Sequence, residues 1–315
     1  MSAMPGPGPA RSATMLALRI AVTVAILALV LRSIDLARVG ETLAKARPAL
    51  LVAALALQLA STTGAAYRWR LVMGNLGFGA SAPFYMASYF KGLFFNQALP
   101  GIGGDAFRVI DVARRGFRKR DALYGVLLDR LLGFAGLMVL SIAGVLLDPG
   151  LLPPAVHRAI ALAMGAGILA ASVILWIGLV PWPWRETGPV TLLRTLSGRA
   201  RRSLSARRTA LAATSLVSPL CAIACFCVAG RALGLPYGSI AYLVMVPPAL
   251  VLSALPVSVA GWGVREGTLV GLFALAGADN AAVLTLSLAY GLMVIVASLP
   301  GLAIFLGARQ NRPAR

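Results

Sequence analysis

Two arginines in this chain follow proline- and glycine-rich breaks in apolar sequence. Arg108 ends the stretch ALPGIGGDAFR at 98–108, and Arg265 lies within ALPVSVAGWGVREG at 254–267. An arginine at membrane depth costs about 2.5–3.5 kcal/mol to insert, so it requires a partner or a function there. A guanidinium can hold a phosphate through two parallel hydrogen bonds. The chemistry indicated at both breaks is therefore binding of an anionic headgroup.

The breaks themselves favour an anion. Pro100 and Pro256 stop a helix, and the glycines that follow permit a tight reversal and close approach of another backbone or a ligand. A helix that restarts there presents unpaired N–H groups with positive dipole character. Gly103 and Gly104 are therefore expected at the headgroup site, and Asp105 is placed to cap the helix that carries Arg108.

Other polar residues near the breaks are candidates for the same site. Lys91 and Asn96 would line one polar cavity only if the helix breaks between them, because their spacing of five puts them on different helical faces. Asp129 and Arg130 are adjacent in an apolar segment, so one could meet the first motif while the other pairs elsewhere, or the two could screen each other.

Arg265 also has a scaffolding interpretation, in which it pairs with Asp129 or Glu266 and holds the bundle together. Arg108 has an alternative too, as an interfacial residue continuous with the basic run from 114 to 120.

The sequence does not favour catalysis. It contains one histidine, His157, and three cysteines, all within the apolar segment 209–230, where they suit packing. No phosphate-binding loop, dinucleotide fingerprint or metal-ligand spacing occurs. We therefore expect no enzyme activity, no cofactor and no metal. Nucleic acid is not expected as a partner either, because no nucleic-acid module accompanies the net charge of +19.

Composition places the chain in a membrane. It is 59% hydrophobic and 12% charged, against about 25% charged residues in ordinary soluble domains. Six apolar runs are near or above the roughly 20 residues that cross a bilayer. These predicted spans are 14–31, 48–66, 122–147, 154–180, 209–230 and 281–306. The predicted fold is an all-α, polytopic membrane helix bundle, preceded by a disordered N-terminus at 1–13 and followed by a cytoplasmic tail at 307–315.

Two further apolar regions, 84–99 and 239–276, are interrupted by the two motifs. The motifs lie 156 residues apart, and the spans that begin at 48 and 122 recur at 209 and 281. Interrupted segments at matching places of two halves are typical of inverted repeats around a transporter's binding site. We therefore predict two broken or re-entrant segments in repeat halves of about 14–147 and 154–306.

Positive charge predicts the orientation, because cytoplasmic loops carry the excess of lysine and arginine. With both motif regions as re-entrant hairpins, 19 of the 29 basic residues lie on the inner side and 6 on the outer side. The C-terminus is then cytoplasmic, and the two hairpins open toward opposite sides. A count with eight crossings is the alternative; it moves the basic segment 32–47 inside and the N-terminus outside.

Three blocks carry a family resemblance: LPGIGGDAFR at 99–108, DRLLG at 129–133, and LP at 255–256 followed by GWGVREG at 261–267. In this order they resemble the lysylphosphatidylglycerol synthase transmembrane region family, also called flippase-like, over nearly the whole chain. In that family, bifunctional members join this membrane region to a cytosolic aminoacyl-transfer domain. Nine residues follow the last predicted span here, so the synthase activity is not expected.

The resemblance implies lipid translocation, or assistance to lipid modification, at a bacterial inner membrane. The expected substrate is an anionic or polyprenyl- or hopanoid-type lipid, with Arg108 and Arg265 touching the headgroup. The alternative is a non-transporting membrane partner that presents lipid to a separate glycosyl- or aminoacyltransferase.

Overall fold

The computed structural model describes residues 36–98, 103–176, 188–255 and 257–310. All regular elements in these ranges are helices, which confirms the all-α prediction. They are α2 (Leu36–Ala44), α3 (Pro48–Asn75), α4 (Ala82–Ala98), α5 (Gly103–Ala113), α6 (Lys119–Leu147), α7 (Pro154–Trp176), α8 (Gly188–Ser205), α9 (Arg208–Ala232), α10 (Ser239–Ser253), α11 (Val264–Leu275) and α12 (Asn280–Gln310). The predictions for 1–13 and 14–31, and residues 99–102 and Pro256 of the two motifs, lie outside the described residues.

Five of the described helices are long and apolar enough to cross a membrane: α3, α6, α7, α9 and α12. They correspond to the five predicted spans that fall within the described residues. Their apolar residues occur around the whole helix circumference, as expected where one face meets lipid and another meets protein. The polytopic helix bundle is thus confirmed.

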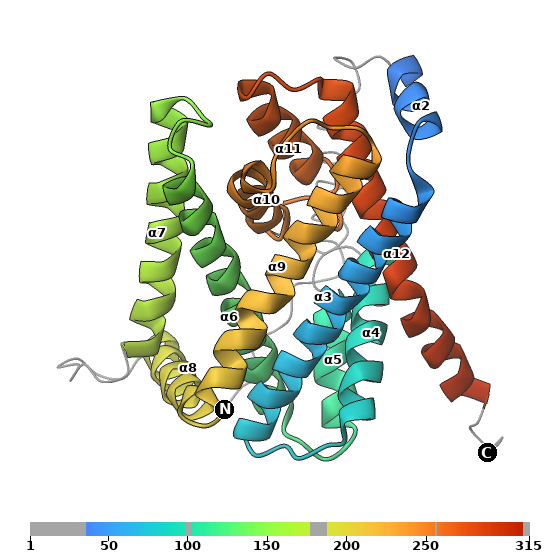
Figure 1. The fold of residues 1–315 in the computed structure, drawn as a ribbon. Helices are drawn as coiled ribbons and strands as arrows, with labels where there is room; N and C mark the ends of the chain where they lie inside the picture. Colours follow the sequence, from blue (N-terminus) through green and yellow to red (C-terminus); the bar gives the residue numbers. More distant parts are fainter. Residues whose placement is uncertain (1–35, 99–102, 177–187, 256, 311–315) are drawn as a thin grey trace, which may run out of the picture.

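The two interrupted regions form helical hairpins. In Figure 1, α4 and α5 lie side by side in the lower half of the bundle, whereas α10 and α11 lie in the upper half. The first hairpin is closed by small residues: a Cβ added at Gly104 would lie 1.9 Å from the carbonyl oxygen of Gly92. Only glycine permits that approach of α5 to α4.

The two halves of the chain repeat one arrangement. A long span, a hairpin and a second long span appear as α3, α4–α5, α6 and again as α9, α10–α11, α12. The first spans, α3 and α9, form the most extensive helix pair among the described elements, and each last span packs on the other half's hairpin, α6 on α10 and α12 on α4. With the hairpins at opposite ends of the bundle (Figure 1), this pattern is that of inverted repeats.

Glycines mark the reciprocal contacts between the halves. A Cβ at Gly144 in α6 would meet the backbone of Leu243 and Val244 in α10, and one at Gly301 in α12 would meet the backbone of Phe90 and Lys91 in α4. Small residues let membrane helices approach closely, and van der Waals contact then holds them together. Each hairpin is therefore held against a span of the opposite repeat.

Candidate functional site

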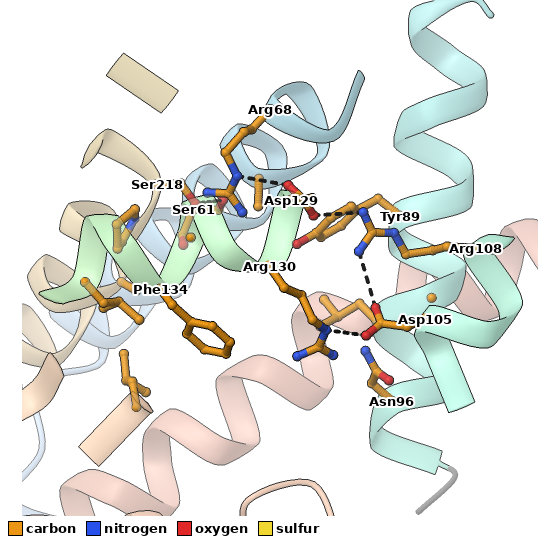
Figure 2. A pocket seen from close by; sticks show the side chains of 18 residues that line it. Ser61, Arg68, Tyr89, Asn96, Asp105, Arg108, Asp129, Arg130, Phe134 and Ser218 are labelled. Carbon is orange, nitrogen blue, oxygen red and sulfur yellow. Dashed lines mark hydrogen bonds and ion pairs between the residues drawn. The ribbon is translucent and has the colours of Figure 1, made fainter. Parts of the chain in front are cut away.

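Asp129 in α6 joins two arginines from different helices. Its Oδ1 accepts a hydrogen bond from Nε of Arg68 in α3 at 2.9 Å, and its Oδ2 accepts one from Nη2 of Arg108 in α5 at 2.8 Å. All three side chains are at least 94% buried. Figure 2 shows the carboxylate between the two guanidinium groups. One carboxylate thus connects the first span, the first hairpin and the second span of the first repeat.

A second carboxylate extends this network. Asp105, in the first turn of α5, accepts from Nη1 of Arg108 at 3.3 Å and is also bonded by Nε of Arg130 in α6. We call Arg68, Asp105, Arg108, Asp129 and Arg130 the arginine cluster. It holds three positive and two negative charges, so an anion would balance it.

Aromatic rings fix the central arginine. The Arg108 guanidinium carbon lies 4.1 Å from the ring centroid of Trp69 and 4.5 Å from that of Tyr89. Its Nε is buried without a hydrogen-bond partner among the described residues. Ring faces attract cations, most strongly where water is excluded. Arg108 is therefore a rigid part of the site, held by both charge and rings.

The cluster lines a pocket of about 250 Å³ between α3, α4, α5, α6, α9 and α10. Leu93, Phe134, Leu137 and Leu250 supply apolar walls. Arg130 is 34% exposed, and it bonds Asp105 through Nε alone. Its two terminal nitrogens, drawn beside Phe134 in Figure 2, have no hydrogen-bond partner within the described part of the chain and remain available to a ligand.

Of the remaining residues predicted near the first break, only Asn96 lines this pocket. Gly103 begins α5, and the N–H of Gly104 donates to Oδ1 of Asn96 at 2.9 Å. The amide of Asn96 therefore satisfies an N-terminal donor of α5, while the carboxylate of Asp105 binds arginines. Lys91 pairs with Asp111 at 2.8 Å and is absent from the pocket lining.

Arg265 occupies the matching place in the second repeat. Its Nε and Nη2 bond Oε1 of Glu266 at 3.1 and 2.5 Å, and Nε also donates to Ser287 in α12 at 3.2 Å. Trp262 and Tyr290 cover its guanidinium. Glu266 has no exposed surface and also accepts from the N–H of Gly263. This is the scaffolding pair considered from the sequence, so a headgroup role for Arg265 stays a prediction.

The structure thus brings together Asn96, Asp105, Arg108, Asp129 and Arg130 around one pocket, and it places Arg265 with Glu266 elsewhere. The family model described as "Lysylphosphatidylglycerol synthase TM region" matches residues 16–301. The chain belongs to this family. Comparison with curated proteins finds no match. As a member of the lysylphosphatidylglycerol synthase transmembrane region family with several apolar spans, it is a multi-pass membrane protein of a lipid-related family.

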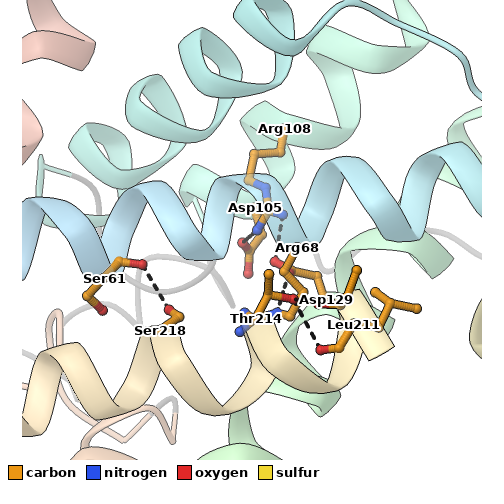
Figure 3. A network of polar contacts seen from close by, with 9 residues as sticks. Ser61, Arg68, Asp105, Arg108, Asp129, Leu211, Thr214 and Ser218 are labelled. Carbon is orange, nitrogen blue, oxygen red and sulfur yellow. Dashed lines mark hydrogen bonds and ion pairs between the residues drawn. The ribbon is translucent and has the colours of Figure 1, made fainter. Parts of the chain in front are cut away.

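Arg68 is the charged residue of this pocket that the sequence analysis does not predict. The predicted span ends at 66 and so excludes Arg68, but α3 continues to Asn75. The stretch AAYRWRLVM at 65–73 contains no proline or glycine, which is the signal that the helix continues. Figure 3 shows the result: Arg68 lies beside Asp129, on the side of α3 that faces α9.

Proposed function

We propose that this protein moves a phosphate-bearing membrane lipid between the two leaflets, with the lipid phosphate bound at the arginine cluster. The observation that carries the proposal is the cluster's excess of one positive charge in a pocket lined by helices of both repeats. A buried cation without a full complement of counter-charges is costly in a membrane protein and typically marks a substrate pathway.

The division of roles within the cluster follows from burial. Arg68 and Arg108 are each at least 94% buried and bonded to aspartates, so they set the charge and shape of the site. Arg130 keeps two terminal nitrogens for a ligand, enough for a bidentate bond to a phosphate. The apolar walls accept the part of the lipid next to the headgroup. No bond of the lipid is broken in this proposal, so the protein is not an enzyme.

The proposed setting is a bacterial inner membrane with the C-terminus cytoplasmic. Membrane lipids are the partners, and nucleic acid is not. In Figure 1, α8 and the α5–α6 turn lie at the lower end of the bundle, where α12 also ends. These segments carry many of the basic residues, which supports a cytoplasmic lower end.

The test is headgroup movement in proteoliposomes that contain the purified protein alone. Fluorescent phosphatidylglycerol in the inner leaflet should become accessible to an impermeant quencher. We expect Arg130→Gln to slow this at least tenfold, because a charged hydrogen bond to phosphate contributes roughly 1.5–3 kcal/mol. Arg130→Lys keeps the charge but loses the two-pronged guanidinium, so its rate of headgroup movement should lie between those of Arg130→Gln and the unaltered protein.

Arg158→Gln is the matched control, since this exposed arginine lies at the start of α7, outside the pocket. Equal rates for Arg130→Gln and the unaltered protein would remove Arg130 from the mechanism. No movement with the unaltered protein would favour the non-transporting partner, which presents lipid to a separate transferase.

A further inference from the structure

A second pocket opens on another face of α6. It has a volume of about 670 Å³, within the range of roughly 300–1,000 Å³ typical of small-molecule sites. Its floor is apolar, formed by α6 and α9 together with Trp176 at the end of α7. We call it the lateral groove. Lipid covers any flat apolar surface of a membrane protein, but a concave one of this size holds an individual molecule.

Two arginines stand at one end of the lateral groove. Arg201 comes from α8 and Arg208 from the first turn of α9. Nε of Arg201 is buried and has no hydrogen-bond partner among the described residues. The described lining contains no acidic side chain to balance either charge. A buried, unsatisfied guanidinium nitrogen beside a second cation indicates a missing anionic ligand.

Helix α8 is fixed where it can present Arg201. Arg199 bonds Asp121 of α6 at 2.5 Å and lies over the ring of Tyr124, with its guanidinium carbon 4.7 Å from the centroid. Asn75 at the end of α3 donates to the carbonyl oxygens of Ser203 and Ala206. In Figure 1, α8 lies near the lower ends of α7 and α9. The charged end of the groove thus lies at the same end of the bundle as α8.

The lateral groove is separate from the arginine cluster. On α6, one face lines the cluster's pocket with Asp129, Arg130, Gly133, Phe134 and Leu137, and another lines the groove with Leu132, Ala135, Gly136 and Val139. Between them α6 and α9 are in close contact: a Cβ at Gly136 would lie 1.7 Å from the carbonyl oxygen of Ser215. The two pockets therefore share no lining residue and are separated by the contact between α6 and α9.

We propose that the lateral groove binds one anionic phospholipid from the leaflet on the α8 side. An acyl chain lies along the apolar floor, and the phosphate bonds Arg201 and Arg208. The spatial order of charge and apolar surface matches that of a phospholipid, with its phosphate at the membrane surface and its chains inward. This site does not depend on lipid transport, so its test and the transport assay can fail separately.

The test is photocrosslinking in nanodiscs made of phosphatidylcholine with a small fraction of phosphatidylglycerol that carries a photoreactive acyl chain. Mass spectrometry of the labelled peptides locates the adduct. We expect labelling within 132–139 and 208–216, reduced roughly tenfold when Arg201→Gln and Arg208→Gln are combined. Arg202→Gln is the control, because it removes the same charge from the neighbouring position of α8, outside the groove lining.

A photoreactive diacylglycerol lacks the phosphate, so it should label these segments of the unaltered protein only weakly. The expected level is that of the double variant with photoreactive phosphatidylglycerol. Ala212→Trp, which fills the floor without changing charge, should also abolish labelling and covers the case in which the double variant fails to fold. Undiminished labelling of the double variant or of Ala212→Trp, or equal labelling by diacylglycerol, would overturn the proposal.

Discussion

Ser218 donates a hydrogen bond to the carbonyl oxygen of Ser61 at 2.8 Å, and the two serines stand 157 residues apart near the middle of α9 and α3. They occupy matching places in the two repeats, and Figure 3 shows their bond where α3 and α9 lie side by side. Next to this contact, a Cβ at Gly64 would lie 3.3 Å from Cβ of Ser218. This hydrogen bond therefore joins matching positions of the first long span in each repeat.

The first prediction concerns the hairpin that carries Arg108. Gly104→Val should prevent α5 from packing on α4, because even a Cβ would lie 1.9 Å from the Gly92 carbonyl oxygen. We expect most of the protein to be lost from the monodisperse peak in detergent size-exclusion chromatography. Gly271→Ala is the control, since a Cβ there meets nothing within 4 Å and alanine favours the helix. A stable, monodisperse Gly104→Val protein would show that the hairpin packs differently.

The second prediction concerns Asp129. Asp129→Asn should leave Arg68 and Arg108 buried with excess charge, and breaking such a pair costs roughly 3–5 kcal/mol. Thermal unfolding in detergent should show a clear loss of stability. Asp111→Asn breaks the less deeply buried pair with Lys91, whose side chains are 13% and 14% exposed, and it leaves only one cation unpaired, so it should cost less. Similar effects of the two replacements would argue against a central structural role for Asp129.

Arg265 gives the third prediction. Arg265→Met should strand the Glu266 carboxylate, which has no exposed surface, and reduce folded protein. Combining it with Glu266→Gln should restore folding, because glutamine can still accept the hydrogen bond from the Gly263 N–H. Yield and thermal stability of the single and double variants measure this. A folded Arg265→Met protein with impaired transport would instead support the headgroup role predicted from the sequence.

Topology provides the fourth prediction. In a cysteine-free background, a cysteine at position 194 in α8 should be protected from an impermeant thiol reagent in intact cells, and one at position 279 before α12 should react. The two positions lie at opposite ends of the bundle (Figure 1), and only α8 is strongly basic. Asp279 is exposed, so access does not limit its labelling. Labelling at 194 but not at 279 would reverse the orientation.

The spans were predictable because hydropathy depends on composition and length alone. The hairpins were predictable because Pro100 and Pro256 interrupt apolar sequence at matching places. The ion-pair partners of the charged residues were not predictable, because adjacency in sequence says little about which helices meet. Asp129 and Arg130 both bond residues of the first hairpin, and Arg68 of α3 also bonds Asp129. Helix α8 is absent from the predicted spans, because its arginines and other polar residues lower its hydropathy.

The equivalent arginines of the two repeats have diverged in an informative way. Arg108 meets an aspartate in its repeat's last span, whereas at the corresponding place Arg265 meets Ser287 and takes its counter-charge from its own neighbour, Glu266. One copy therefore shares its charge across three helices, and the other is neutralised within a single helical turn. The second repeat's arginine is thus electrostatically self-contained, whereas the arginine cluster of the first repeat carries one more positive charge than its two aspartates balance.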